Sequence, residues 1–141
     1  MAAPSVLRLL DANANRALEG LRVCEDLFRF YYAHARLFGR LRRLRHALGA
    51  TLGGLPVSRA ALARARDTRR DPGRQAPAGR AASIEQLVVI NFQRAKEALR
   101  VLEECCRLAA PAHSPGFQRL RFEAYDAERQ CLLYLATVRH S

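Results

Sequence analysis

The segment NFQRAKEALRVLEE, from Asn91 to Glu104, repeats most of NANRALEGLRVCED, from Asn13 to Asp26. The two segments align at an offset of 78 residues, and the shared positions include polar as well as apolar residues. In both segments apolar residues recur at helical spacing, so each is expected to lie within an amphipathic helix. Two copies are too few for a solenoid and instead predict one pseudo-two-fold molecule.

The rest of the chain is also dominated by helix-forming residues. Ser83 and Gln86 have the spacing of a capping box, which predicts a helix start. The segment 53–82 is rich in Gly, Pro and Arg and is expected to be a loop with a short helix around residues 58–66. The fold predicted is all-α: a pseudo-two-fold four-helix bundle in one domain. Its expected parts are a first hairpin at about residues 5–52, a connecting loop at about 53–82 and a second hairpin at about 83–138.

The chain has 141 residues and a net charge of +11, which indicates anionic partners. All but one of the 24 basic residues are arginine, the residue best suited to bidentate phosphate binding. Arginine and alanine enrichment together are also typical of a GC-rich genome, and that interpretation carries at least equal weight.

Cys24, Cys105, Cys106 and Cys131 form no CxxC pair and lack histidines at zinc-finger spacing. Reduced, buried thiols in a cytoplasmic protein are therefore expected. The N-terminal residues contain no long apolar run, so neither a signal peptide nor a membrane span is predicted. Homodimerisation is left open by the sequence.

One polar sector of the repeated helix lies opposite its apolar face. A solvated stripe of helical ion pairs, each worth about a few tenths of a kcal/mol, explains this sector without any function. Alternatively, Arg22 and Arg100 bind phosphate while acidic neighbours orient them. The sector contains Asn15, Glu19, Arg22 and Asp26 in the first copy, and Gln93, Glu97, Arg100 and Glu104 in the second.

Other polar residues lie at the edges of the apolar sector. Burying Arg, Glu or Asn without partners costs free energy, so their repetition predicts a polar pocket between the two hairpins. A purely structural polar network would produce the same pattern. On one edge are Asn13, Arg16, Asn91 and Arg94, beside the small residues Gly20 and Ala98; Glu25 and Glu103 flank the other edge.

The loop supplies Arg66, Asp67 and Asp71, and acidic residues beside arginine can hold magnesium and phosphate together. Ordinary turn capping explains the same residues. The sequence contains no Walker loop, GxGxxG, GxSxG or HExxH motif. A basic helical nucleic-acid binder stays open, although the motifs of known DNA and RNA modules are missing.

Four segments together resemble a known family: DANANRALEGLRVCED (11–26), RDTRRDPG (66–73), NFQRAKEALRVLEEC (91–105) and LRFEAYDAE (120–128). They are similar to the small helical domain at the N-terminus of some bacterial thiamin phosphate synthases, a hydroxymethylpyrimidine phosphate kinase. Cys24 and Pro72 depart from the expected aliphatic residue and valine. The resemblance covers about residues 6–129 and does not include the synthase barrel, so synthase activity is not implied.

This resemblance implies transfer of the ATP γ-phosphoryl group to hydroxymethylpyrimidine phosphate, with magnesium as a cofactor and thiamin phosphate synthase as a partner. Under this hypothesis Asn13 and Asn91 read the pyrimidine edge. Asp67 and Asp71 are candidate magnesium ligands, with Glu25 and Glu103 as alternatives. The catalytic candidates are Arg22, Arg100 and Asp67, and the further phosphate-binding candidates are Arg16, Arg94, Arg45, Arg66 and Arg121. A non-catalytic accessory or regulatory domain is the alternative within the same family.

Overall fold

The computed structural model describes residues 3–139 and contains helices but no strand within that range. This confirms the all-α prediction, while the pseudo-two-fold relation of the hairpins and the assignment to one domain stay predictions. The elements in chain order are α1 (Pro4–Asp26), the π-helical turn η1 (Leu27–Tyr31), α2 (Ala35–Gly53), α3 (Arg59–Ala65), α4 (Ile84–Ala109), the 3₁₀ turn η2 (Pro111–His113) and α5 (Ser114–Arg139).

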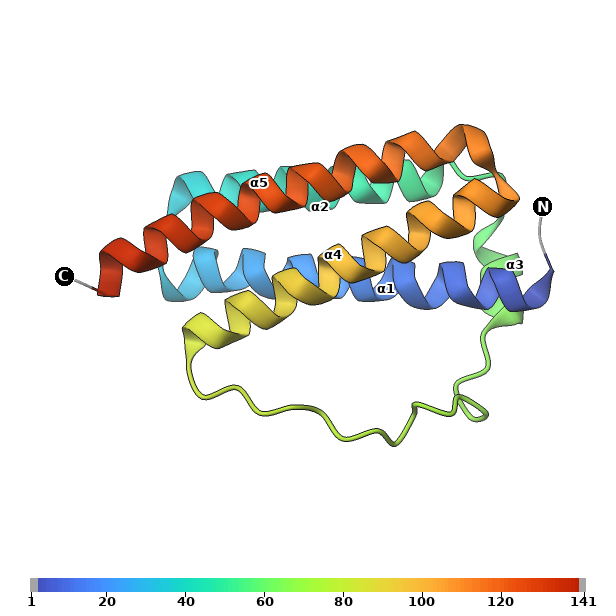
Figure 1. Cartoon of the computed structure of the whole chain (residues 1–141), viewed down its shortest axis with the longest axis horizontal. Coiled ribbons are helices and arrows are strands. Elements are labelled where there is room, and N and C mark those ends of the chain that lie inside the picture. Colours follow the sequence, from blue (N-terminus) through green and yellow to red (C-terminus); the bar gives the residue numbers. More distant parts are fainter. Residues whose placement is uncertain (1–2, 140–141) are drawn as a thin grey trace.

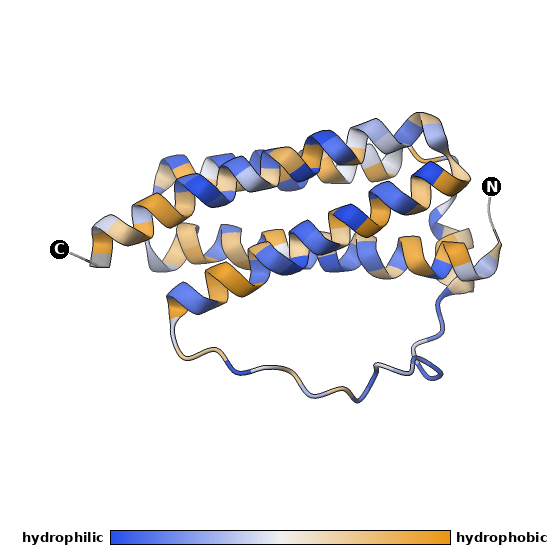
Figure 2. Ribbon diagram, viewed as in Figure 1, coloured by the Kyte–Doolittle hydropathy of each residue, from blue (hydrophilic) through white to orange (hydrophobic). Residues whose placement is uncertain are grey.

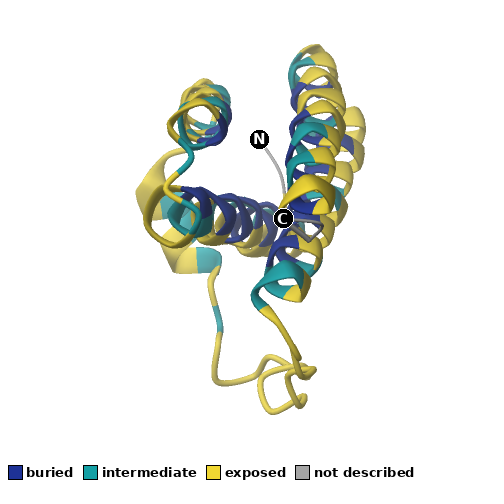
Figure 3. Cartoon of the chain, turned by 90° about the vertical axis from the view of Figure 1, so that its left-hand side faces the viewer, coloured by how far each residue is buried: buried dark blue, intermediate teal, exposed yellow. Residues whose placement is uncertain are grey.

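Four long helices form a bundle in which α1 and α4 cross in opposite directions (Figure 1). Helix α2 packs on α1, α5 packs on α4, and α2 and α5 also contact each other. Hydrophobic and hydrophilic residues alternate along each long helix (Figure 2), and the buried residues lie on the faces turned toward the neighbouring helices (Figure 3). No helix in residues 3–139 combines the length and hydropathy needed to cross a membrane.

Three helices begin at side-chain caps that satisfy free amides of the first turn. The Ser83 hydroxyl accepts a hydrogen bond from the Gln86 amide (3.1 Å), and the Gln86 side chain accepts one from the Ala82 amide (2.6 Å). The capping box predicted at this position is therefore confirmed. His34 Nδ1 caps α2 by accepting from the Leu37 amide, and Ser58 caps α3 by accepting from the Ala61 amide.

The first hairpin reverses through a segment that is not regular α-helix. Regular α-helix ends at Asp26 and continues as the wider turn η1, after which Ala33 adopts a left-handed φ of 50°. Phe28 is fully buried within this turn, and its ring centre lies 5.0 Å from Tyr32 and 6.0 Å from Tyr134. These aromatic contacts pack the turn between α1 and α2 onto α5.

All four cysteines are free and buried, as expected. Desolvation raises the pKa of every thiol, to about 11 at Cys106 and about 12 at Cys131, from an ordinary value of 9.0. Each thiol in the folded chain therefore stays protonated at a pH where it would ionise in the unfolded chain.

We expect two consequences of this burial. The native protein should react slowly with a thiol reagent at about pH 8, and all four thiols should react once denaturant is added. The free energy of unfolding should fall as the pH rises above about 9, because the unfolded thiols then lose protons that the folded thiols retain. Thiol titration with and without denaturant, and denaturation curves at rising pH, check these expectations. Rapid native labelling of all four thiols would contradict the buried arrangement.

Candidate active site

The site is built where α1 and α4 come closest. A Cβ added to Gly20 would lie 2.8 Å from the Asn91 carbonyl oxygen and 3.3 Å from the Ala95 amide nitrogen. Real Cβ atoms do not approach backbone this closely, so the crossing requires glycine at position 20. The repeat places Ala98 at the equivalent position of α4, so small residues occupy this position in both helices.

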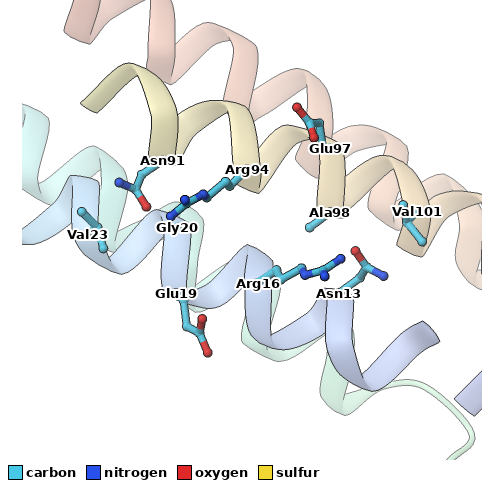
Figure 4. Close-up of a pocket in the computed structure, with 10 residues that line it drawn as sticks. All are labelled: Asn13, Arg16, Glu19, Gly20, Val23, Asn91, Arg94, Glu97, Ala98 and Val101. Atoms are coloured by element: carbon cyan, nitrogen blue, oxygen red, sulfur yellow. The ribbon is translucent and has the colours of Figure 1, made fainter. Parts of the chain in front are cut away.

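A pocket of about 550 Å³ opens at this crossing, within the size range of small-molecule sites. Its lining consists of the same five repeat positions taken once from α1 and once from α4 (Figure 4). The polar edge of α1 and the equivalent polar edge of α4 therefore line the same pocket. The lining residues are Asn13, Arg16, Glu19, Gly20 and Val23 of α1, and Asn91, Arg94, Glu97, Ala98 and Val101 of α4.

Two guanidinium groups in this pocket lack partners. Neither Arg16 nor Arg94 makes a hydrogen bond or ion pair with any residue in the range 3–139. Figure 4 shows Arg16 extending along α1 toward Asn13, and Arg94 extending along α4 toward Asn91. Two unpaired cations lining one pocket repel each other and favour a bound anion, particularly phosphate.

The acidic residues of the pocket do not neutralise these arginines. Figure 4 shows Glu19 pointing away from α4 and Glu97 pointing away from α1. The Glu97 carboxylate accepts a hydrogen bond from Gln93 Nε2 at 2.9 Å on the outer face of α4. The gap between the two helices therefore presents guanidinium and amide groups to a ligand.

The two asparagines are buried and oriented by their own helices. Asn13 Nδ2 donates to the Leu9 carbonyl at 2.9 Å, and Asn91 Nδ2 donates to the Leu87 carbonyl at 2.8 Å. With the amide nitrogen held in this way, Oδ1 is the group left to accept a hydrogen bond from a ligand. Each half of the pocket thus offers one guanidinium donor and one amide acceptor.

A second cavity of about 610 Å³ adjoins the first at its α1 side and shares Asn13, Arg16 and Glu19 with it. Asp67 and Asp71 line this second cavity, so the structure places the predicted loop residues at the same cavity as Arg16. Each of their carboxylates accepts one backbone hydrogen bond through Oδ1, from Arg70 and Gly73 respectively. Asp67 Oδ2 lies 3.8 Å from Arg70 Nε in an exposed ion pair, and Asp71 Oδ2 has no hydrogen bond or ion pair within the described part of the chain.

A strong ion pair fastens the start of the loop to α1. Arg66 donates to both Asp11 carboxylate oxygens, Nε to Oδ2 and Nη2 to Oδ1, each at 2.7 Å. The Asp11 side chain is 9% exposed, whereas that of Arg66 is 50% exposed. The Arg66 fork is therefore engaged by Asp11 at the edge of the second cavity, and residues 68–83 that follow are exposed throughout. Asp11 is not part of the repeated pattern, because the aligned residue in the second copy is Val89.

The catalytic candidates Arg22 and Arg100 lie outside the pocket at the α1–α4 crossing. Arg22 pairs with Asp26 at 3.3 Å, and Arg100 pairs with Glu104 at 3.4 Å, each with a half-exposed arginine side chain. These contacts are ion pairs within one helix, as expected for a solvent-exposed stripe that has no binding function. A phosphate-binding role for the two residues stays a prediction.

Glu25 and Glu103 form the same kind of buried ion pair in the two hairpins. Glu25 is held by Arg45, with Nε to Oε1 at 2.6 Å and Nη2 to Oε2 at 3.2 Å; Glu103 is held by Arg121, with Nε to Oε1 at 2.9 Å. These four residues, which the sequence suggests as phosphate or magnesium ligands, instead form two ion pairs, one between α1 and α2 and one between α4 and α5. Within residues 3–139 no group of three or more Asp, Glu, His or Cys side chains is arranged to hold a metal ion.

Replacing Arg45 with alanine is expected to reduce the free energy of unfolding by about 3 kcal/mol, because it leaves the Glu25 carboxylate buried without its partner. The Glu25 side chain is 2% exposed, so water reaches it poorly. Chemical denaturation of the variant measures the effect. Arg42→Ala, at an exposed position of the same helix, is the matched control. Equal stability of the two variants would show that the buried pair contributes little.

The fold and the site define a class of protein: a helical bundle with an arginine-lined pocket where its two repeated helices cross. The chain belongs to the ThiD2 family, whose model matches residues 8–130. The expected family resemblance is therefore confirmed. No solved structure matches the chain.

Three relatives are each named thiamine-phosphate synthase. The protein from Synechocystis sp. is 37% identical, with 94% of this chain and 41% of the relative covered. The protein from Nostoc punctiforme is 40% identical, with 87% and 34% covered, and that from Rhodopirellula baltica is 34% identical, with 94% and 36% covered. The chain thus spans about two-fifths or less of the length of these relatives.

Proposed function

We propose that this chain acts in thiamin biosynthesis as a kinase that transfers the γ-phosphoryl group of ATP to hydroxymethylpyrimidine phosphate, giving the diphosphate and ADP. The observation that carries the proposal is the pair of unpartnered guanidiniums, Arg16 and Arg94, in one pocket of ligand size. Membership of the ThiD2 family and the names of the relatives support the pathway.

The chemistry asks for charge neutralisation and alignment more than for a catalytic base. An oxygen of the acceptor phosphate attacks the γ-phosphorus, and the bond from that phosphorus to the bridging oxygen of ADP breaks. The attacking oxygen is already ionised at neutral pH, so no proton has to be removed from it. Two anions must instead be held close together and in line, which arginines that bind the two phosphates accomplish. Arg16 and Arg94 are the residues suited to this role.

Asp67 and Asp71 suit the magnesium that accompanies a nucleoside triphosphate. Magnesium in such sites is commonly held by one or two carboxylates together with phosphate oxygens and water. Both residues line the cavity beside Arg16 and keep one carboxylate oxygen free of hydrogen bonds. Bound magnesium would neutralise phosphate charge, and the two aspartates and Arg16 would position the polyphosphate.

A non-catalytic accessory domain is the second candidate. It is favoured by one observation, that the matched part covers about two-fifths or less of the relatives named thiamine-phosphate synthase. Such a domain would bind pathway metabolites in the same pocket without turning them over.

Turnover separates the two candidates. The purified chain is incubated with ATP, magnesium and hydroxymethylpyrimidine phosphate, and the products are resolved by phosphorus NMR or anion-exchange chromatography. The kinase proposal requires equal amounts of pyrimidine diphosphate and ADP, both lost when magnesium is chelated. Binding of either ligand without product would support the accessory domain and refute the kinase.

A further inference from the structure

We propose that the two halves of the α1–α4 pocket hold different substrates: the Arg16 half holds the nucleoside triphosphate with its magnesium, and the Arg94 half holds the pyrimidine monophosphate. This inference rests on the proposed kinase function and adds to it the location of donor and acceptor. Sequence analysis alone does not distinguish the two halves, because every lining position comes from the same repeat.

The likeness of the halves explains how one pocket can accept both substrates. Each half presents one free guanidinium and one amide oxygen, from Arg16 and Asn13 or from Arg94 and Asn91. Both substrates carry a phosphate and an aromatic heterocycle with an exocyclic amino group. A guanidinium matches the phosphate, and an amide oxygen can accept from the amino group. Two such half-sites facing each other place two phosphates in one pocket.

The surroundings of the halves differ in a way that selects the donor. The second cavity adjoins the pocket through Asn13, Arg16 and Glu19, so the Arg16 half continues into a further volume of about 610 Å³. No residue of the Arg94 half lines that cavity. The α4 side adjoins a smaller cavity of about 310 Å³ through Glu97. A nucleoside triphosphate is far larger than a pyrimidine monophosphate, so the half with the larger adjoining volume is the one that accommodates it.

The charges around the second cavity point the same way. Asp67 and Asp71 would repel a bare phosphate but become favourable once magnesium lies between them and the polyphosphate. The Arg66–Asp11 ion pair holds the beginning of the segment that carries Asp67 and Asp71 against α1. At the position equivalent to Asp11 the second copy has Val89, so the corresponding anchor is missing on α4. The Arg16 half therefore suits a magnesium-bound anion, and the Arg94 half suits a small free phosphate.

Separate binding measurements test the assignment. Isothermal titration calorimetry is carried out with the magnesium complex of a non-hydrolysable ATP analogue alone, and with hydroxymethylpyrimidine phosphate alone. Arg16→Ala is expected to raise the Kd of the nucleotide by about 10-fold or more and that of the pyrimidine by less than about 3-fold. Arg94→Ala should do the reverse. Arg16→Gln and Arg94→Gln, which keep side-chain bulk, repeat the test, and thermal melts verify folding.

Each alternative outcome has a definite meaning. If Arg16→Ala weakens the pyrimidine and Arg94→Ala weakens the nucleotide, the assignment is overturned while wild-type turnover still supports the kinase. Equal weakening of both ligands by both variants would indicate one shared anion site and would also overturn it. If wild-type protein binds neither ligand and shows no turnover, the proposed function fails and the assignment fails with it. Arg42→Ala, an exposed arginine on α2, should change neither Kd.

Discussion

Replacing Arg16 and Arg94 together with alanine is expected to lower kcat/KM for pyrimidine phosphate phosphorylation by about 10³-fold or more. Loss of a single preorganised donor to a transition-state anion commonly costs about 10²-fold, and here two guanidiniums are removed from one pocket. Because both side chains are exposed and unpaired, their loss should leave the free energy of unfolding within about 0.5 kcal/mol of wild type. Steady-state kinetics and chemical denaturation of the same preparation measure the two quantities.

The comparison that sharpens this experiment is the double variant Arg22→Ala, Arg100→Ala. These arginines hold helical ion pairs with Asp26 and Glu104 outside the pocket, so their joint loss is expected to affect kcat/KM much less. Arg42→Ala should have the kinetics of wild type. A larger loss from the Arg22 and Arg100 pair than from the Arg16 and Arg94 pair would move the phosphate site from the helix crossing to the outer sector of the helices.

The helices could be predicted from the sequence because their signals are local. The Ser83 hydroxyl accepts from the Gln86 amide and the Gln86 side chain accepts from the Ala82 amide, so this helix start is encoded within five residues. Apolar periodicity likewise operates over one or two turns. The end of the first helix was less predictable. The π-helical turn at Leu27–Tyr31 depends on where Phe28 packs against Tyr134, which lies more than a hundred residues away in the chain.

The repeat also carries the prediction of a polar pocket. Asn13 and Arg16 lie at the edge of the apolar face, and the same residues recur at Asn91 and Arg94. This repetition predicts polar side chains in the interface between the two helices. The partners of the other candidates could not be predicted. Glu25 looks the same in the sequence whether it binds a metal or an arginine, and only the packing of α2 on α1 brings Arg45 to it.

Asp11 shows the limit of arguing from a repeat. Its bidentate contact with Arg66 joins α1 to the connecting loop, and that loop has no counterpart in the second hairpin. A comparison of the two copies therefore detects what they share and misses what distinguishes them. The same asymmetry supports the proposal that donor and acceptor bind in different halves of the pocket.

Gly20→Ala is expected to destabilise the fold by about 2–3 kcal/mol, even though alanine is the better helix former. The added methyl group would lie 2.8 Å from the Asn91 carbonyl oxygen and 3.4 Å from the Ala95 side chain. The nearest obstacle is backbone, so α1 and α4 must separate to admit it. Separation loosens the best-packed contact of the bundle and moves Arg16 away from Arg94. Chemical denaturation measures the stability, and the affinity for the magnesium–nucleotide complex and for the pyrimidine monophosphate measures the pocket.

Gly49→Ala in α2 is the matched control, because a Cβ at that position meets nothing within 4 Å. Helix propensity alone then operates, and the substitution should stabilise the protein by about 0.5–1 kcal/mol. If the two substitutions change the free energy of unfolding in opposite directions, the steric effect at Gly20 is distinguished from the backbone-entropy effect at Gly49. If Gly20→Ala were as stabilising as Gly49→Ala, α1 and α4 would not be in close contact at Gly20.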